Sequence, residues 1–94
     1  MRFFLGPNHA WKRKVTFLHG KALFEAGETV ESIKAFTSSL EMKEGLEFTP
    51  DSMVYFSRGL AQKQLGKREF FKKDMEEAAR QGSKEAVQLL AEMA

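Results

Sequence analysis

The sequence predicts an all-α fold made of two antiparallel helical hairpins and a C-terminal capping helix. Apolar residues recur every three or four positions over most of the 94-residue chain, which is the spacing that lines one face of a helix. Glycines stand where each apolar pattern stops, and glycine readily takes the left-handed conformation that ends a helix. No segment alternates apolar and polar residues or carries a β-hairpin dipeptide such as Asn-Gly, so the sequence predicts no sheet.

The chain has the length and composition of one small domain, with 43% hydrophobic and 30% charged residues. We expect residues 1–9 to be a lead segment and residues 10–94 to form one helical domain. The absence of cysteine excludes disulfides, cysteine-ligated zinc and thiol catalysis. Pro7 and Asn8 interrupt the apolar start, so we expect no targeting segment and no membrane insertion. We therefore expect a cytoplasmic protein or, alternatively, a soluble domain of a longer anchored or exported protein.

The first helical hairpin is expected over residues 10–43, and Gly27 separates its two helices. Thr29 is a suitable N-cap for the second helix, because its hydroxyl can accept a hydrogen bond from a free backbone N–H of the first turn. The face of the first helix expected to point inward carries Trp11, Val15, Leu18, Ala22 and Ala26. In the second helix, the corresponding residues are Val30, Ile33, Phe36 or Thr37, and Leu40.

A linker over residues 44–49 leads to the second hairpin, residues 50–81. Thr49 can cap its first helix, and Pro50 suits the first helical position. Gly66 separates the two helices, whose expected inward residues are Met53, Tyr55 or Phe56, Leu60, Ala61, Leu65, Phe71, Met75, Ala78 and Ala79. Gly82 and Ser83 then supply a helix end and a new cap. The capping helix, residues 83–93, is expected to cover the preceding helix with Ala86, Val87, Leu90 and Met93.

The two hairpins repeat one pattern. Gly59 lies 39 positions after Gly20, and Gly66 lies 39 positions after Gly27. The same offset pairs Val15 with Val54, Phe17 with Phe56, and Ala22 with Ala61. Gly20 and Gly59 lie within helices, where glycine is about 1 kcal/mol less favourable than alanine. We therefore expect a neighbouring helix to cross close to the backbone at both glycines.

This glycine spacing, with Leu23 after Gly20 and Tyr55 before Gly59, resembles tetratricopeptide repeats. The Ala-Ala-x-x-Gly phrase that ends at Gly82 resembles the related Sel1-like repeats. Over residues 11–93, the resemblance implies a right-handed stack of two antiparallel helical hairpins with a concave face built from their first helices. The chain departs from the tetratricopeptide pattern at Arg58, where the pattern has leucine, and in its 39-residue spacing, which exceeds about 34 residues.

No set of side chains predicts an enzyme, a metal site or a cofactor. Neither His9 nor His19 has a carboxylate four positions away, and cysteine is absent, so the sequence contains no metal-ligand spacing. The sequence predicts no strand that could lead into a glycine-rich phosphate loop. We therefore expect a binding or assembly module.

A second stripe on the first helix, repeated on the third, predicts a partner-binding groove. By the resemblance, these residues look into the concave face, and they are Lys14, Phe17, Lys21, Phe24, Met53, Phe56, Leu60 and Lys63. Aromatic residues flanked by lysine suit a partner peptide or helix with apolar anchors and some acidic residues. Alternatively, Phe17 and Phe56 belong to the core, because a stack of two hairpins turns its first helices inward.

Self-association is the alternative function, because two repeats are fewer than the three usually needed to bury a continuous core. The uncovered residues Phe3, Phe4, Leu5 and Trp11 are expected to form a homo-oligomer or to dock on a neighbouring domain. Nucleic-acid binding is less favoured, since the formal net charge is only +2. It would use Lys12, Arg13, Lys14, Lys21 and Lys63, with Phe17 and Phe24 as stacking platforms.

Overall fold

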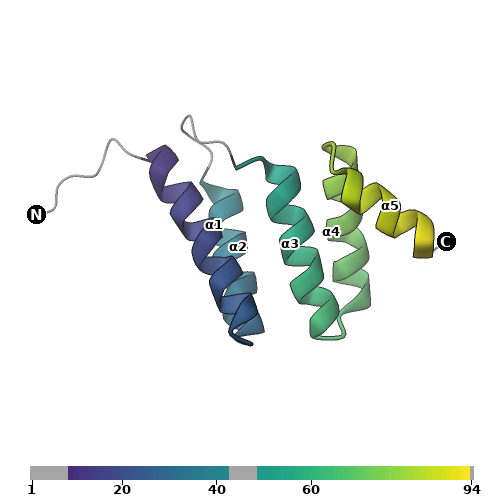
Figure 1. Ribbon diagram of the computed structural model, residues 1–94, viewed down its shortest axis with the longest axis horizontal. Coiled ribbons are helices and arrows are strands. Elements are labelled where there is room, and N and C mark those ends of the chain that lie inside the picture. The colour runs from purple at the N-terminus through teal and green to yellow at the C-terminus, as the bar shows by residue number, and fades with distance from the viewer. Residues whose placement is uncertain (1–8, 43–48, 94) are drawn as a thin grey trace, which may run out of the picture.

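The computed structural model describes residues 9–42 and 49–93, with the side chains of residues 9–12 left out, and contains five α-helices in this part of the chain (Figure 1). The helices are α1 (His9–Glu25), α2 (Thr29–Glu41), α3 (Asp51–Gln64), α4 (Arg68–Arg80) and α5 (Lys84–Met93). The described residues contain no strand, so the all-α prediction is confirmed. The right-handed sense of the stack stays a prediction. Most of the predicted linker falls on residues 43–48, outside the described residues.

The helices follow one another as packed neighbours. Helices α1 and α2 form the first hairpin, α3 and α4 form the second, and α2 packs against α3 where the hairpins meet. Figure 1 shows the two hairpins side by side, with α5 at the far end slanting away from α4.

Three helix ends share one backbone motif, centred on the positive-φ glycines Gly27, Gly66 and Gly82. In each, the residue after the glycine donates its N–H to a carbonyl five positions earlier. These bonds are Glu28 to Leu23 at 2.8 Å, Lys67 to Gln62 at 2.9 Å, and Ser83 to Ala78 at 2.9 Å. The glycines therefore end the helices, as the sequence predicts.

The residue directly after each of these glycines lies immediately before the next helix. Glu28 and Lys67 are the N-caps of α2 and α4, and Ser83 precedes the first residue of α5. Of these residues, only Ser83 has a hydroxyl, and this hydroxyl accepts a hydrogen bond from the backbone N–H of Ala86 at 3.1 Å. The predicted cap at Thr29 is wrong, because Glu28 takes the cap position and Thr29 is already helical. The predicted cap at Thr49 is also wrong, because Pro50 holds that position with an extended backbone.

The two mid-helix glycines mark the close crossings that the sequence predicts. A Cβ atom added to Gly20 would lie 2.7 Å from the ring of Phe36, and one added to Gly59 would lie 2.7 Å from Met75 Cε. Met75 stands 39 positions after Phe36, so the internal repeat also holds in three dimensions. Helix α2 therefore crosses α1 as α4 crosses α3.

The core has two clusters. The cluster where the hairpins meet consists of Phe17, Phe36, Leu40, Val54 and Ala61. The cluster between α4 and α5 consists of Phe71, Met75, Ala78 and Ala86, with partly buried Phe56, Leu60, Leu89 and Leu90 packed against it.

The predicted inward face of α1 is wrong. Val15 is 44% exposed and Leu18 is 51% exposed. Ala22 and Ala26 are also exposed, and the side chain of Trp11 is not described. The buried face of α1 instead carries Arg13, Phe17 and Gly20. These residues lie three or four positions apart, so they share the face that Gly20 brings against α2.

Several other residues predicted to point inward are exposed, namely Val30, Met53, Leu65, Val87 and Met93. Their exposure reflects the side of the helix on which they lie, since Thr29, Val54 and Ala86, next to three of them, are buried. Val87 lies on the outward side of α5, which no further helix covers in the described part of the chain.

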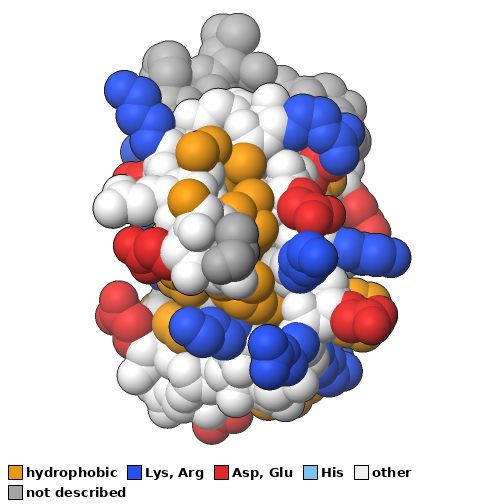
Figure 2. All heavy atoms as spheres, turned by 90° about the vertical axis from the view of Figure 1, so that its right-hand side faces the viewer, with side chains coloured by type: hydrophobic (Ala, Val, Ile, Leu, Met, Phe, Trp, Pro, Cys, Tyr) orange, Lys and Arg blue, Asp and Glu red, His pale blue; other side chains and the backbone are white. Residues whose placement is uncertain are grey.

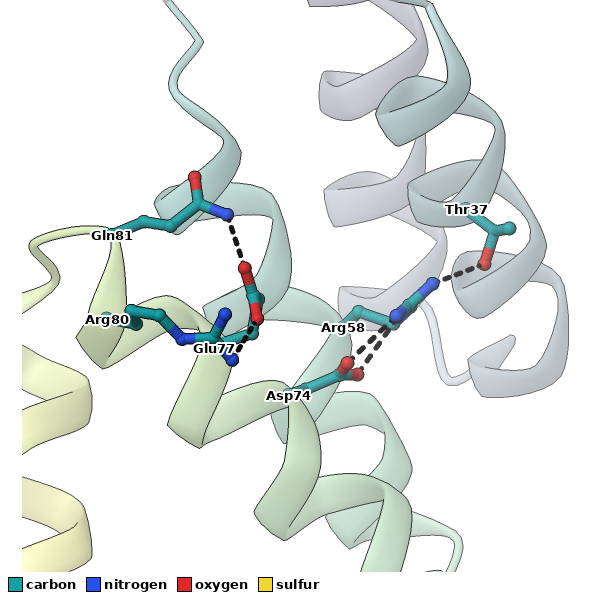
Figure 3. A network of polar contacts seen from close by, with 6 residues as sticks. All are labelled: Thr37, Arg58, Asp74, Glu77, Arg80 and Gln81. Atoms are coloured by element: carbon teal, nitrogen blue, oxygen red, sulfur yellow. Dashed lines mark hydrogen bonds and ion pairs between the residues drawn. The ribbon is translucent and has the colours of Figure 1, made fainter.

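Polar contacts reinforce the packing between helices. Arg58 of α3 binds Asp74 of α4 and Thr37 of α2 (Figure 3). Arg13 of α1 forms an ion pair with Asp51 at the start of α3. The departure of Arg58 from the repeat pattern therefore has a structural role.

Candidate peptide-binding groove

A groove with a volume of about 630 Å³ lies between the second hairpin and α5. Its lining residues come from α3, from the turn after it, from the first half of α4, and from α5. They are Lys63, Gly66, Arg68, Glu69, Phe71, Lys72, Leu89 and Met93.

The groove lies where α5 diverges from α4, since the packing of α5 on α4 is complete at Ala86 and only partial at Leu89 and Leu90. The cap at Ser83 fixes the first turn of α5, and Ala86 is fully buried against α4. At the other end of α5, Met93 is 43% exposed. The slant of α5 in Figure 1 agrees with this change along the helix. The first half of α4 therefore borders a groove that α5 covers only in part.

The groove combines an apolar floor with a positive rim. Phe71, Leu89 and Met93 supply apolar surface. The charged lining residues are the cations Lys63, Arg68 and Lys72 and the single carboxylate Glu69. In Figure 2, which views the molecule from the side of α5, hydrophobic side chains form a strip in the middle, with lysine and arginine side chains below it. The groove thus offers apolar contact and an excess of positive charge together.

Aromatic rings help to position two of the neighbouring lysines. The Nζ atom of Lys63 lies 5.6 Å from the centre of the Phe71 ring, within the range of a cation–π contact. Lys67 Nζ lies 5.8 Å from the centre of the Phe70 ring, which is itself 55% exposed. Both lysines are exposed, so their charge stays accessible to a partner.

The structure places the predicted groove residues in different environments. Phe17 is only 4% exposed and belongs to the core, as the alternative interpretation holds. Phe24, Phe56 and Leu60 are partly buried against the two core clusters. The remaining predicted residues are exposed, and they are Lys14, Lys21, Met53 and Lys63. Of the eight residues, Lys63 alone lines the groove beside α5.

Sequence reasoning missed Arg68, Lys72, Leu89 and Met93. One signal points to part of this set, because the segment from Lys67 to Lys73 places two phenylalanines between pairs of cations. The repeat gives a second signal. Lys63 and Lys72 stand 39 positions after Phe24 and Ile33, so two apolar positions of the first hairpin are cationic in the second.

The opposite end of the described chain has a smaller and more open hollow of about 280 Å³ between α1 and α2. It is lined mainly by polar residues, namely Thr16, His19, Leu23, Glu31, Lys34, Ala35 and Ser38. The predicted self-association residues Phe3, Phe4 and Leu5 lie outside the described residues, and the side chain of Trp11 is not described. Self-association through them stays a prediction.

The part of the chain that the structure describes contains no group of three histidine, aspartate or glutamate side chains placed to hold a metal ion. A membrane span would require a longer apolar helix than any in the same part of the chain. Comparisons with models of protein families, with curated proteins and with solved structures give no match to this chain.

Proposed function

We propose that this chain is a protein-interaction module that holds a segment of a partner protein in the groove between the second hairpin and α5. The supporting observation is the combination of an apolar floor with three cations in one hollow. Binding sites for peptides commonly use apolar anchors for affinity and nearby charges for orientation.

The two kinds of side chain contribute differently. Burying one large apolar side chain of the partner contributes about 1.5–3 kcal/mol. An exposed ion pair contributes only about 0.2–1 kcal/mol. The more exposed Leu89 and Met93 therefore supply most of the affinity beside the largely buried Phe71, whereas the cations select acidic segments over basic ones.

Selection from a library of random peptides displayed on phage tests this function. The protein is expected to enrich peptides that combine large apolar residues with glutamate or aspartate. A Lys72→Glu variant should lose these peptides, because it reverses a charge at the rim. A Lys14→Glu variant is the matched control, because Lys14 is exposed on α1, away from the groove. The proposal is wrong if selection enriches no peptide, or if both variants lose the peptides equally while remaining folded.

Self-assembly is a second candidate function, which the repeat favours. Val54 and Ala61 are fully buried where the hairpins meet, whereas their counterparts Val15 and Ala22 are exposed. A second copy of the chain could cover this surface of α1. Sedimentation should then detect a dimer at micromolar concentration that a Leu18→Lys variant dissociates. A monomer in both proteins would exclude this function.

A further inference from the structure

The groove lies at the place that α3 fills one repeat earlier. Phe24 and Ile33 of the first hairpin pack against the core cluster together with Tyr55 of α3. Their counterparts 39 positions later are Lys63 and Lys72, and both line the groove. The same side of each hairpin thus meets a helix in the first repeat and an open groove in the second.

The two hairpins are similar enough for this comparison. Both cross at a glycine, with Ala35 Cβ at 3.3 Å from the added Cβ in the first and Asp74 Cβ at 3.2 Å in the second. Ala35 and Asp74 are also 39 positions apart. A helix that packs beside the first hairpin therefore has an equivalent position beside the second.

Helix α5 covers this position only in part. It has 10 residues where α3 has 14, and its packing on α4 goes from the fully buried Ala86 to the partly buried Leu89 and Leu90 and the exposed Met93. The remaining volume of about 630 Å³ is close to that of one helical turn, given a diameter of ~10–12 Å and a pitch of 5.4 Å. The groove therefore admits the side chains on one face of a short helix.

The charges at the groove set the chemistry of that helix. Lysines replace Phe24 and Ile33, and Arg68 adds a third cation, whereas Glu69 is the single acid among the lining residues. An occupying helix must bring carboxylates to these cations and apolar side chains to Phe71, Leu89 and Met93. A helix with a basic face would be repelled.

We infer that the partner segment is a short acidic amphipathic helix of another protein, which lies in the space that α5 leaves open between the first half of α4 and its own C-terminal end. This inference rests on the proposed function of the groove. A second copy fits poorly, because α1, the counterpart of α3, carries cations at residues 12–14 and Lys21 and only one acid, Glu25. A nucleic acid also fits poorly, since Phe71 is 6% exposed and offers no open ring on which a base could stack.

Three synthetic peptides of about 14 residues test the inference by fluorescence anisotropy and circular dichroism. The first has apolar residues at helical spacing with glutamates beside them. The second is identical except for a central proline, which disrupts a helix by about 3 kcal/mol. The third carries lysine in place of every glutamate. The first peptide should bind and gain helical signal, the second should bind at least about tenfold more weakly, and the third should not bind.

A charge-reversal variant provides the specificity control. In the double variant Lys63→Glu, Lys72→Glu, affinity for the glutamate peptide should fall at least about tenfold, and the lysine peptide should now bind. A loss of structure could not produce this exchange of preference. The Lys14→Glu variant should behave as the unmodified protein.

Each contrary result has a distinct meaning. Equal binding of the proline peptide would overturn the helical conformation and leave the proposed function intact. If the lysine peptide binds as well as the glutamate peptide, and the double variant Lys63→Glu, Lys72→Glu binds the glutamate peptide unchanged, the inferred acidic character of the partner would be overturned. Failure of all peptides here, together with failure of the phage selection, would overturn the proposed function as well. Tighter binding of a single-stranded oligouridine that weakens steeply with salt would assign the groove to nucleic acid instead.

Discussion

Arg58 of α3 donates two parallel hydrogen bonds to the carboxylate of Asp74 on α4, from Nε to Oδ2 at 2.9 Å and from Nη2 to Oδ1 at 2.8 Å (Figure 3). Its Nη1 atom donates a third bond to Thr37 of α2 at 3.1 Å. The hydrogen bonds with Asp74 raise the pKa of Arg58, although burial alone would lower it. Because this pKa lies above that of Arg58 in the unfolded chain, the contribution of Arg58 to the free energy of unfolding is fully present below the unfolded-state pKa. It is lost only at extreme alkaline pH. The titration of Arg58 therefore adds no pH dependence near neutrality.

Asp74→Ala is expected to lower the free energy of unfolding by about 2–4 kcal/mol, because it leaves the guanidinium of Arg58 partly buried without its carboxylate. The side chains of Arg58 and Asp74 are 20% and 7% exposed, so solvent screens the pair only weakly. Urea denaturation measures the loss, with the exposed Glu76→Ala as the control. In a double variant with Arg58→Met, the loss should be smaller than the sum of the single losses. If Asp74→Ala and Glu76→Ala lower the free energy of unfolding equally, the Arg58–Asp74 ion pair does not contribute to stability.

The repeat-equivalent glycines should respond differently to alanine. At Gly20 the new Cβ would meet the rigid ring of Phe36, which is 1% exposed. At Gly59 it would meet the flexible end of Met75, which can change rotamer. Overpacking costs about 1–3 kcal/mol, whereas alanine adds about 1 kcal/mol of helix propensity. We therefore expect Gly20→Ala to destabilise by about 1–2 kcal/mol and Gly59→Ala to be nearly neutral.

Chemical denaturation of the two alanine variants measures this difference directly. In a further variant, Gly20→Ala combined with Phe36→Leu, the loss should be smaller than the sum of the two single losses, because leucine removes the ring that the new methyl group meets. Equal losses at Gly20 and Gly59 would contradict the assigned roles of Phe36 and Met75.

The number of helices and their ends could be predicted from local chemistry. Gly27, Gly66 and Gly82 adopt positive φ at the turns, as their places in the sequence indicate. The N-caps could not be predicted as easily, because the residue after each glycine both takes part in the glycine motif and directly precedes the next helix. That residue, and not Thr29, becomes the cap of α2.

The buried face of α1 depends on a feature that the apolar pattern alone does not resolve. Two stripes of apolar residues run along this helix, one through Leu18 and the other through Phe17 and Phe24. Gly20 distinguishes them, because a close crossing at Gly20 also buries the residues three before and four after it. The predicted crossing at Gly20 therefore implies burial of Phe17, a consequence that the choice of the Leu18 stripe overlooked.

The groove could not be predicted in the same way. It depends on the slant of α5, which follows from the burial of Ala86 and the exposure of Met93. These are tertiary properties of a short helix whose apolar residues fit more than one orientation. The sequence contains only two partial signals, the two phenylalanines between cations from Lys67 to Lys73 and the replacement of Phe24 and Ile33 by Lys63 and Lys72 between the repeats.

Two adjacent residues of α1 give the sharpest test of its orientation. Phe17 packs on Phe36 with 5.7 Å between ring centres and is 4% exposed, whereas Leu18 is 51% exposed. Phe17→Ala should destabilise by about 3–5 kcal/mol, because it leaves a cavity where the hairpins meet. Leu18→Ala should change stability by no more than about 0.5 kcal/mol. If Phe17→Ala fails to fold, Phe17→Leu should still lose about 1 kcal/mol in urea denaturation. A larger loss for Leu18→Ala than for either Phe17 variant would mean that α1 is rotated and that its predicted inward face is the buried one.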